Sequence, residues 1–178
     1  MGIEELGDAV RFLQSSAIAI AISDAMRPDV PLVYVNPAFE TLTGYAQDRV
    51  AGRNCRFLQA GLDNDAARAE LRDAIGAGRP AQVVLRNRTA AGFEFDNLLF
   101  LEPLRNGAGD IRFFAGSQFD VSTHARRDRV GDHADRLQRD LERLQTVNRD
   151  LVFENRGQLA RSAAQVIQQW MHRRESRA

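Results

Sequence analysis

Three strand-like segments follow one another between residues 81 and 121, and they constrain the fold more than any other feature. Their sequences are AQVVLRNRT, FEFDNLLFLEPL and IRFFAGSQFDV, separated only by AAG and by RNGAGD. Connections this short cannot hold the crossover that parallel strands need, so they predict hairpins. This part of the chain is therefore expected to form an antiparallel sheet.

The preceding residues add two strands and two helices to this sheet. AIAIAI near 17–22 and LVYVN at 32–36 are typical of strands. A helix is expected after Asn36-Pro37, and a second over 63–76, where Gly76 and Gly78 end the apolar pattern. The order indicates an α+β fold, a five-stranded antiparallel sheet with helices on one face.

Helices are predicted at both ends of the chain. Apolar residues at alternating steps of four and three, from Val130 to Leu151, form a heptad seam with Asn148 at an a position. Gly157 predicts a break, followed by a second amphipathic helix in which Trp170 anchors packing. We therefore divide the chain into an N-terminal amphipathic helix (1–15), a globular domain (16–122) and a C-terminal two-helix extension (123–178).

Composition excludes several classes of protein. One cysteine in 178 residues excludes an intrachain disulfide and a zinc site built on cysteines. A formal net charge of zero gives the whole chain no bias toward nucleic acids or membranes. The longest apolar run is too short to span a bilayer, and the beginning MGIEEL lacks the pattern of a secretory signal. We expect a cytoplasmic protein.

Carboxamides lie on the apolar faces of the three strands. By the two-residue period, Asn87, Asn97 and Gln118 each share a face with apolar neighbours. Those neighbours are Val83 and Leu85, then Phe93, Phe95, Leu99 and Leu101, and finally Phe114 and Gly116. A buried amide without a partner costs about 1–3 kcal/mol. These amides either bond one another and the backbone, or they bond the edge of a planar ring that Gly116 allows to lie close to the sheet.

The segment GRNCRFLQ places Cys55 between Asn54 and Arg56, with Gln59 at its end. Arg72 lies on the next predicted helix. Two guanidinium groups that reach one point are typical of a phosphate site, although solvated arginines and an inert buried cysteine are the commoner roles. The residues alone indicate a pocket for a phosphorylated heterocycle with a nearby thiol.

GRNCRFLQ also closely resembles the core motif of LOV domains, the flavin-binding blue-light sensors of the PAS superfamily. The resemblance runs from about residue 16 to 121, with YVNPAFETLTGY before the motif and LRDAI, FDNLL and GSQFD after it. It implies a PAS/LOV fold, and the chain looks like a bacterial short LOV photoreceptor without a fused effector domain. The flavin contacts that it implies are Asn54, Cys55, Arg56, Gln59, Arg72, Asn87, Asn97, Leu99, Phe114 and Gln118.

The resemblance further implies photochemical signalling, not enzyme catalysis, and no metal. Cys55 is the implied photoreactive residue: on illumination its sulfur bonds to flavin carbon C4a, N5 is protonated, and the bond breaks again in the dark. Gln118 then rotates its amide, while Arg56 and Arg72 hold the phosphate. An enzyme using Cys55 as a nucleophile is excluded because the globular domain contains no histidine to act as its base.

Two departures from the LOV pattern concern the pocket. Ala60 stands where Gly is usual and is expected to alter the following turn, and Leu99 stands where Phe is common beside the ring. There is no insertion between the motif and the next helix, which favours FMN, with FAD as the alternative.

The signal is expected to pass from Gln118 through the last strand to the terminal helices and to alter homodimer association. A separate, unknown downstream protein is the expected partner. One alternative is a light-regulated DNA-binding protein, although the 12 Arg of the tail are interspersed with 8 acidic residues, so a nucleic-acid partner is disfavoured. The other alternative is a flavin-free PAS protein-interaction module.

Overall fold

A computed structural model describes residue 7, residues 9–122 and residues 137–175. Within the last helix, it describes side chains from 153 to 173. The whole of the predicted seam between Val130 and Leu151 therefore lies outside the described side chains, as do residues 1–6 and 8 of the predicted N-terminal helix.

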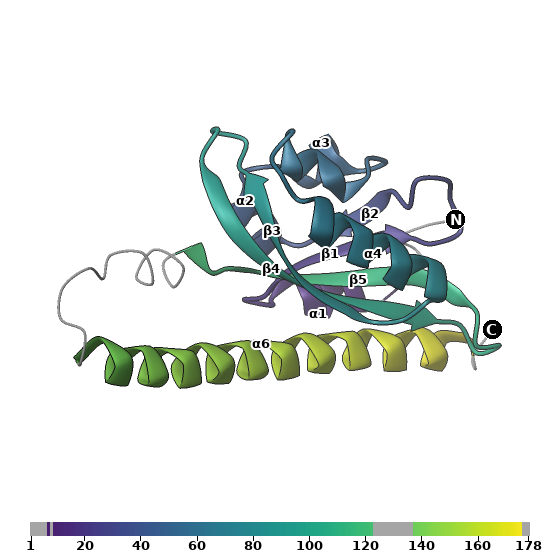
Figure 1. Ribbon diagram of the computed structural model, residues 1–178. Helices are drawn as coiled ribbons and strands as arrows, with labels where there is room; N and C mark the ends of the chain where they lie inside the picture. The colour runs from purple at the N-terminus through teal and green to yellow at the C-terminus, as the bar shows by residue number, and fades with distance from the viewer. Residues whose placement is uncertain (1–6, 8, 123–136, 176–178) are drawn as a thin grey trace.

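The described residues form one five-stranded sheet, as predicted (Figure 1). Its order is β2-β1-β5-β4-β3, and every neighbouring pair is antiparallel. The strands are β1 (Ala19–Asp24), β2 (Leu32–Val35), β3 (Ala81–Arg88), β4 (Glu94–Arg105) and β5 (Ile111–Asp120). Phe93, which the sequence places on an apolar strand face, precedes β4 and is 73% exposed.

Helices cover both faces of the sheet. They are α1 (Ala9–Gln14), α2 (Pro37–Thr43), α3 (Gln47–Val50), the 3-10 helix η2 (Cys55–Gln59), α4 (Asp65–Ala77) and α6 (Leu137–Glu175). Alternate residues of β1 point to opposite faces of the sheet and pack against different helices. Ala19 and Ala21 pack with α2, α3 and η2, whereas Ile20 and Ile22 pack with α1 and α6. We call the first side the inner face and the second the outer face.

The C-terminal part differs from the prediction. A single helix, α6, runs through Gly157 without a break and lies along the sheet (Figure 1). A Cβ atom at Gly157 would lie 3.1 Å from Cε1 of Phe100 on β4. The glycine therefore allows the helix to approach the sheet closely, and this packing outweighs its low helix propensity.

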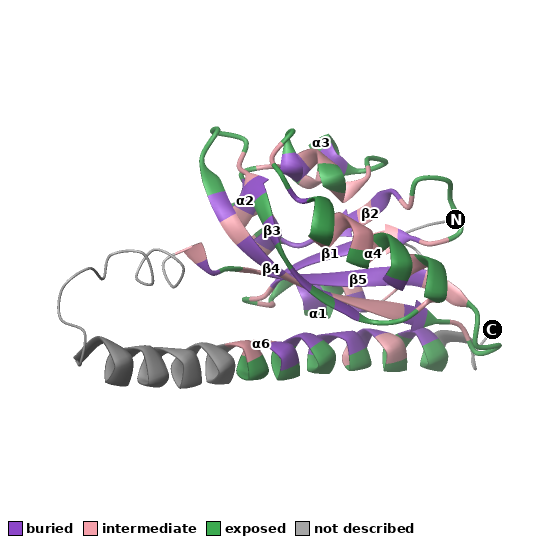
Figure 2. Cartoon of the chain, viewed as in Figure 1, coloured by how far each residue is buried: buried purple, intermediate pink, exposed green. Residues whose placement is uncertain are grey.

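The side of α6 that packs on the sheet agrees only in part with the sequence pattern, which places Leu159, Ala163, Val166, Ile167, Trp170 and Met171 on one side of the helix. Ala160, Ala163, Ala164, Ile167 and Met171 are buried against the outer face, while Leu159 is 52% exposed. Trp170, expected to anchor packing, is 37% exposed. Figure 2 shows the buried side of α6 turned toward the sheet and the exposed side turned away.

Candidate functional site

A cavity of about 800 Å³ lies between the inner face of the sheet and the segment formed by η2 and α4. The structure brings all of the predicted site residues to its wall. These are Asn54, Cys55, Arg56, Gln59, Arg72, Asn87, Asn97, Leu99, Phe114 and Gln118. They come from three strands and two helical segments, and the antiparallel register places the strand residues on one face.

Cys55 begins η2, and its neighbours fix the backbone there. Oδ1 of Asn54 accepts hydrogen bonds from the backbone N of Arg56, at 2.9 Å, and from its Nε, at 3.1 Å. Nδ2 of Asn54 donates to the carbonyl oxygen of Asp29 at 2.5 Å. Cys55 as a residue is half-buried, and burial of its thiol raises the pKa to about 12. The sulfur at the cavity wall therefore keeps its proton at neutral pH.

The amides predicted on the strand faces are buried around the cavity. Asn87, Asn97 and Gln118 are each at most 3% exposed. Nδ2 of Asn97 donates to Oε1 of Gln118 at 3.2 Å. Among the described residues, the Oδ1 atoms of Asn87 and Asn97 have no hydrogen-bond partner. Because an unpartnered buried acceptor costs about 1–3 kcal/mol, these oxygens suit a ligand that presents N–H or O–H donors.

Gly116 has a different neighbour from the expected one. It does not line the cavity, and a Cβ atom there would lie 3.2 Å from Cδ1 of Leu99. The glycine therefore makes room for Leu99, and the side chain of Leu99 lines the cavity in its place.

Charged residues at the cavity include two that sequence reasoning missed. Asp29 forms an ion pair with Arg56, which lies 27 residues later in the sequence. No local sequence pattern predicts a contact over that separation. Arg68 donates from Nε to Oε1 of Gln59 at 2.6 Å. Its position four residues before Arg72 was an available signal, because residues at that spacing share one face of a helix.

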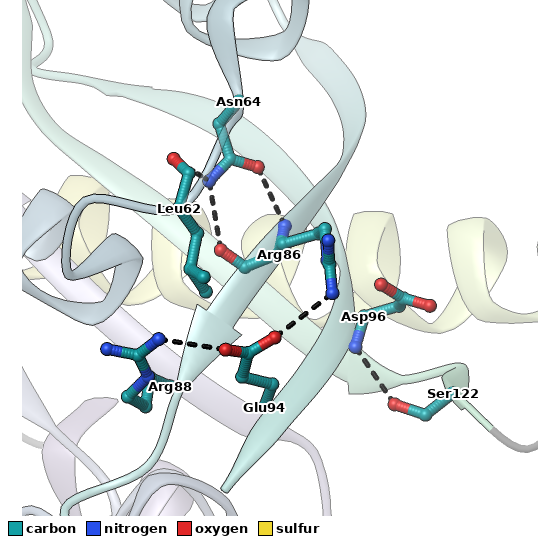
Figure 3. A network of polar contacts seen from close by, with 7 residues as sticks. All are labelled: Leu62, Asn64, Arg86, Arg88, Glu94, Asp96 and Ser122. Carbon is teal, nitrogen blue, oxygen red and sulfur yellow. Dashed lines mark hydrogen bonds and ion pairs between the residues drawn. The ribbon is translucent and has the colours of Figure 1, made fainter. Parts of the chain in front are cut away.

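Asn64 fixes the start of α4 against β3 (Figure 3). Its Oδ1 accepts from the backbone N of Arg86 at 2.7 Å, and its Nδ2 donates to the carbonyl oxygen of Arg86 at 2.9 Å. β3 is an edge strand, so Asn64 satisfies backbone groups that no neighbouring strand reaches. Arg86 and Arg88 also pair with Glu94 across the β3–β4 hairpin. The start of α4 is thus held to β3 by two bonds from the Asn64 side chain to the backbone.

A family model for the PAS domain matches residues 17–123. The chain belongs to the PAS family. Its globular part is a LOV domain: the solved structures that it resembles include an RNA-binding light-oxygen-voltage receptor, with 44% identity and a TM-score of 0.65, covering 68% of this chain and 35% of that chain. The Rhodobacter sphaeroides LOV protein is 34% identical with a TM-score of 0.64, and the match covers 98% of this chain and 99% of that one.

Curated relatives carry the same LOV region within longer proteins. Blue-light-activated histidine kinase 1 of Erythrobacter litoralis (strain HTCC2594) is 44% identical over 110 residues, which are 61% of this chain and 30% of the relative. Phototropin-2 of Oryza sativa subsp. japonica is 44% identical over 122 residues, which are 68% of this chain and 13% of the relative. The chain thus spans less than a third of either relative.

LOV domains bind a flavin, and the residues of this cavity fit one. The buried Oδ1 atoms of Asn87 and Asn97 can accept from ring N–H groups, and the arginines can bind a phosphate. The predicted PAS/LOV fold is confirmed, with α1 and α6 added on the outer face. Among the described residues, no helix is long and apolar enough to span a membrane.

Proposed function

We propose that this chain is a blue-light sensor that holds FMN in the 800 Å³ cavity and uses Cys55 as its photoreactive residue. The observation that carries the proposal is a single cavity lined both by a protonated thiol, on η2, and by two unpartnered buried amide oxygens, on the sheet. A flavin-free interaction module would leave those oxygens without partners.

A bound flavin would supply absorption of blue light and an excited ring that can add a thiol. Cys55 would contribute both the sulfur that adds to such a ring and, from its S–H bond, the hydrogen that the ring takes up. Release of both in the dark would restore the thiol of Cys55, so that no substrate would be consumed. The raised pKa of Cys55 matters here because the neutral thiol carries the proton that the addition requires.

The remaining cavity residues orient the ring and its side chain. Asn87 and Asn97 present acceptors, Leu99 and Phe114 present apolar surface, and Arg56 and Arg72 supply guanidinium groups for a phosphate. Asp29 partly offsets the charge of Arg56 in its ion pair. We favour FMN over FAD because η2 and α4 are joined by only a short connection, which leaves no added segment to cover a second nucleotide half.

The proposed signal leaves through β5. Gln118 faces the cavity, while the next residue, Phe119, makes an edge-to-face contact with Phe100 on the outer face, at 5.9 Å between ring centroids. Phe100 and Val121 pack with Ala160 of α6. A rotation of the Gln118 amide would therefore disturb a strand whose other face supports α6.

We propose that this disturbance alters homodimer association in the cytoplasm and is read by a separate protein. The histidine kinase relatives carry regions beyond the part that this chain matches, so we assign no catalytic activity to it. The mixed charge of the tail favours a protein partner over a nucleic acid.

Flavin content and oligomeric state test this proposal together. Heat-released cofactor, separated by chromatography, should be FMN in a ratio near one per chain. Size-exclusion elution of the full chain should differ between darkness and blue light. A protein that binds no flavin would overturn the sensor, and identical elution volumes would overturn only the dimer output.

A further inference from the structure

We propose that Arg68 is a positioning residue of the cavity: it turns the side-chain amide of Gln59 so that the NH₂ group faces the ligand. This inference rests on the proposed flavin site and identifies a specificity determinant within it. Arg68 does not belong to the GRNCRFLQ segment and lies nine residues beyond Gln59 on a different helix.

The contact is short and partly buried, since the side chain of Arg68 is 38% exposed. Nε of Arg68 lies 2.6 Å from Oε1 of Gln59, and Gln59 is 5% exposed. Both residues line the cavity. The bond joins the last residue of η2 to the first turns of α4, and Asn64 fixes α4 against β3 just before it. Gln59 and Arg68 therefore belong to segments, η2 and α4, that other hydrogen bonds hold in place.

The chemistry of the two groups decides which way the amide points. The oxygen and the NH₂ group of a glutamine have nearly the same shape, so only the surrounding bonds distinguish them. A guanidinium group donates hydrogen bonds and cannot accept them, and it stays charged at every working pH. Arg68 therefore requires the oxygen of Gln59 on its side, which leaves Nε2 as a donor for the cavity.

This orientation completes a recognition pattern. Gln59 offers a donor, whereas Asn87 and Asn97 offer acceptors that have no partner among the described residues. Such a set is complementary to a heterocycle whose polar edge carries both carbonyl and N–H groups. A flipped Gln59 would present an oxygen to a ligand carbonyl, and the two acceptors would repel.

Phosphate binding is the competing role for Arg68, because Arg72 lies four residues later on the same helix face. The observed bonds favour the positioning role. Nε is occupied by Gln59, and Nη1 lies 3.9 Å from the carboxylate of Asp65. Riboflavin, which lacks the phosphate, separates the two roles.

The test titrates the flavin-free 178-residue chain with riboflavin and with FMN and follows flavin fluorescence. We expect Arg68→Met to weaken both ligands about ten-fold, since Gln59 loses its orienting partner. Arg68→Lys, which keeps a donor-only cation, should recover most of this loss. Arg72→Met should weaken FMN alone. Arg79→Met, which removes an exposed arginine paired with Glu70, is the matched control and should change neither.

A double-mutant cycle and a spectrum complete the test. In a Gln59→Leu background, Arg68→Met should have no further effect on affinity, and both single variants should shift the flavin absorption maximum in the same direction. Weakening of FMN alone by Arg68→Met, additive effects in the cycle or unchanged affinities would overturn the inference. If the wild-type protein binds neither flavin, the proposed function fails and the inference fails with it.

Discussion

Asn97 on β4 donates a hydrogen bond of 3.2 Å to Oε1 of Gln118 on β5, and both side chains are buried at the cavity wall. The bond links two central strands of the sheet. It also gives Gln118 a defined starting orientation, from which a rotation of the amide would break an interaction between strands.

Replacing Gln118 by Leu should separate light detection from output. Leu has a similar volume but can neither accept the hydrogen bond from Asn97 nor form one with the flavin ring. We expect the variant to bleach in blue light and recover in the dark, while its size-exclusion elution no longer depends on light. A light-dependent elution shift of wild-type size in Gln118→Leu would show that the signal leaves by another route.

Ala60 should carry backbone strain that a glycine relieves. Its φ is 45° and its ψ is 39°, in the left-handed region that costs residues with a Cβ atom about 1 kcal/mol or more. We expect Ala60→Gly to raise the free energy of unfolding by about 1 kcal/mol in urea titrations. Ala51→Gly is the control: its φ is −55°, so glycine there should give no gain.

Gly157 should tolerate no large side chain, because α6 packs against Phe100 at that point. We expect Gly157→Leu to lower the free energy of unfolding by about 1–3 kcal/mol through overpacking. The exposed Gln158→Leu on the same helix should change it little. A stabilised Gly157→Leu protein would mean that this part of α6 does not pack on the sheet.

The thiol of Cys55 should react slowly with alkylating reagents in the flavin-free folded protein. With the pKa raised to about 12, the thiolate fraction at pH 8 is about 10⁻⁴. Alkylation by iodoacetamide should therefore rise about ten-fold per pH unit from pH 7 to 10 without levelling. The urea-unfolded chain is the reference, and its rate should level near pH 9. Levelling at that pH in the folded protein would contradict the buried, protonated thiol.

The parts of the fold that follow local patterns were predictable. A two-residue period placed Asn87, Asn97 and Gln118 on one inner face, and short connections required antiparallel pairing. The segment GRNCRFLQ indicated four more residues of the cavity wall, Asn54, Cys55, Arg56 and Gln59. These features depend on near neighbours in the chain, which a single sequence displays.

What could not be predicted depends on distant packing. Helix propensity alone predicts a break at Gly157. The structure shows instead that a glycine is needed there because the ring of Phe100 on β4 packs against the helix. The ion pair of Arg56 with Asp29 spans 27 residues and a strand. Arg68 was missed for a different reason: its spacing to Arg72 was visible, but its bond to Gln59 depends on how η2 turns into α4.

The most direct test of the account is the visible absorption of the purified 178-residue chain before and after blue light, compared with Cys55→Ala. The account predicts a flavin band in both proteins that bleaches reversibly in the wild type and persists in the variant. A wild-type protein without the band, even after incubation with FMN, would contradict it, as would a variant that bleaches to the same product spectrum.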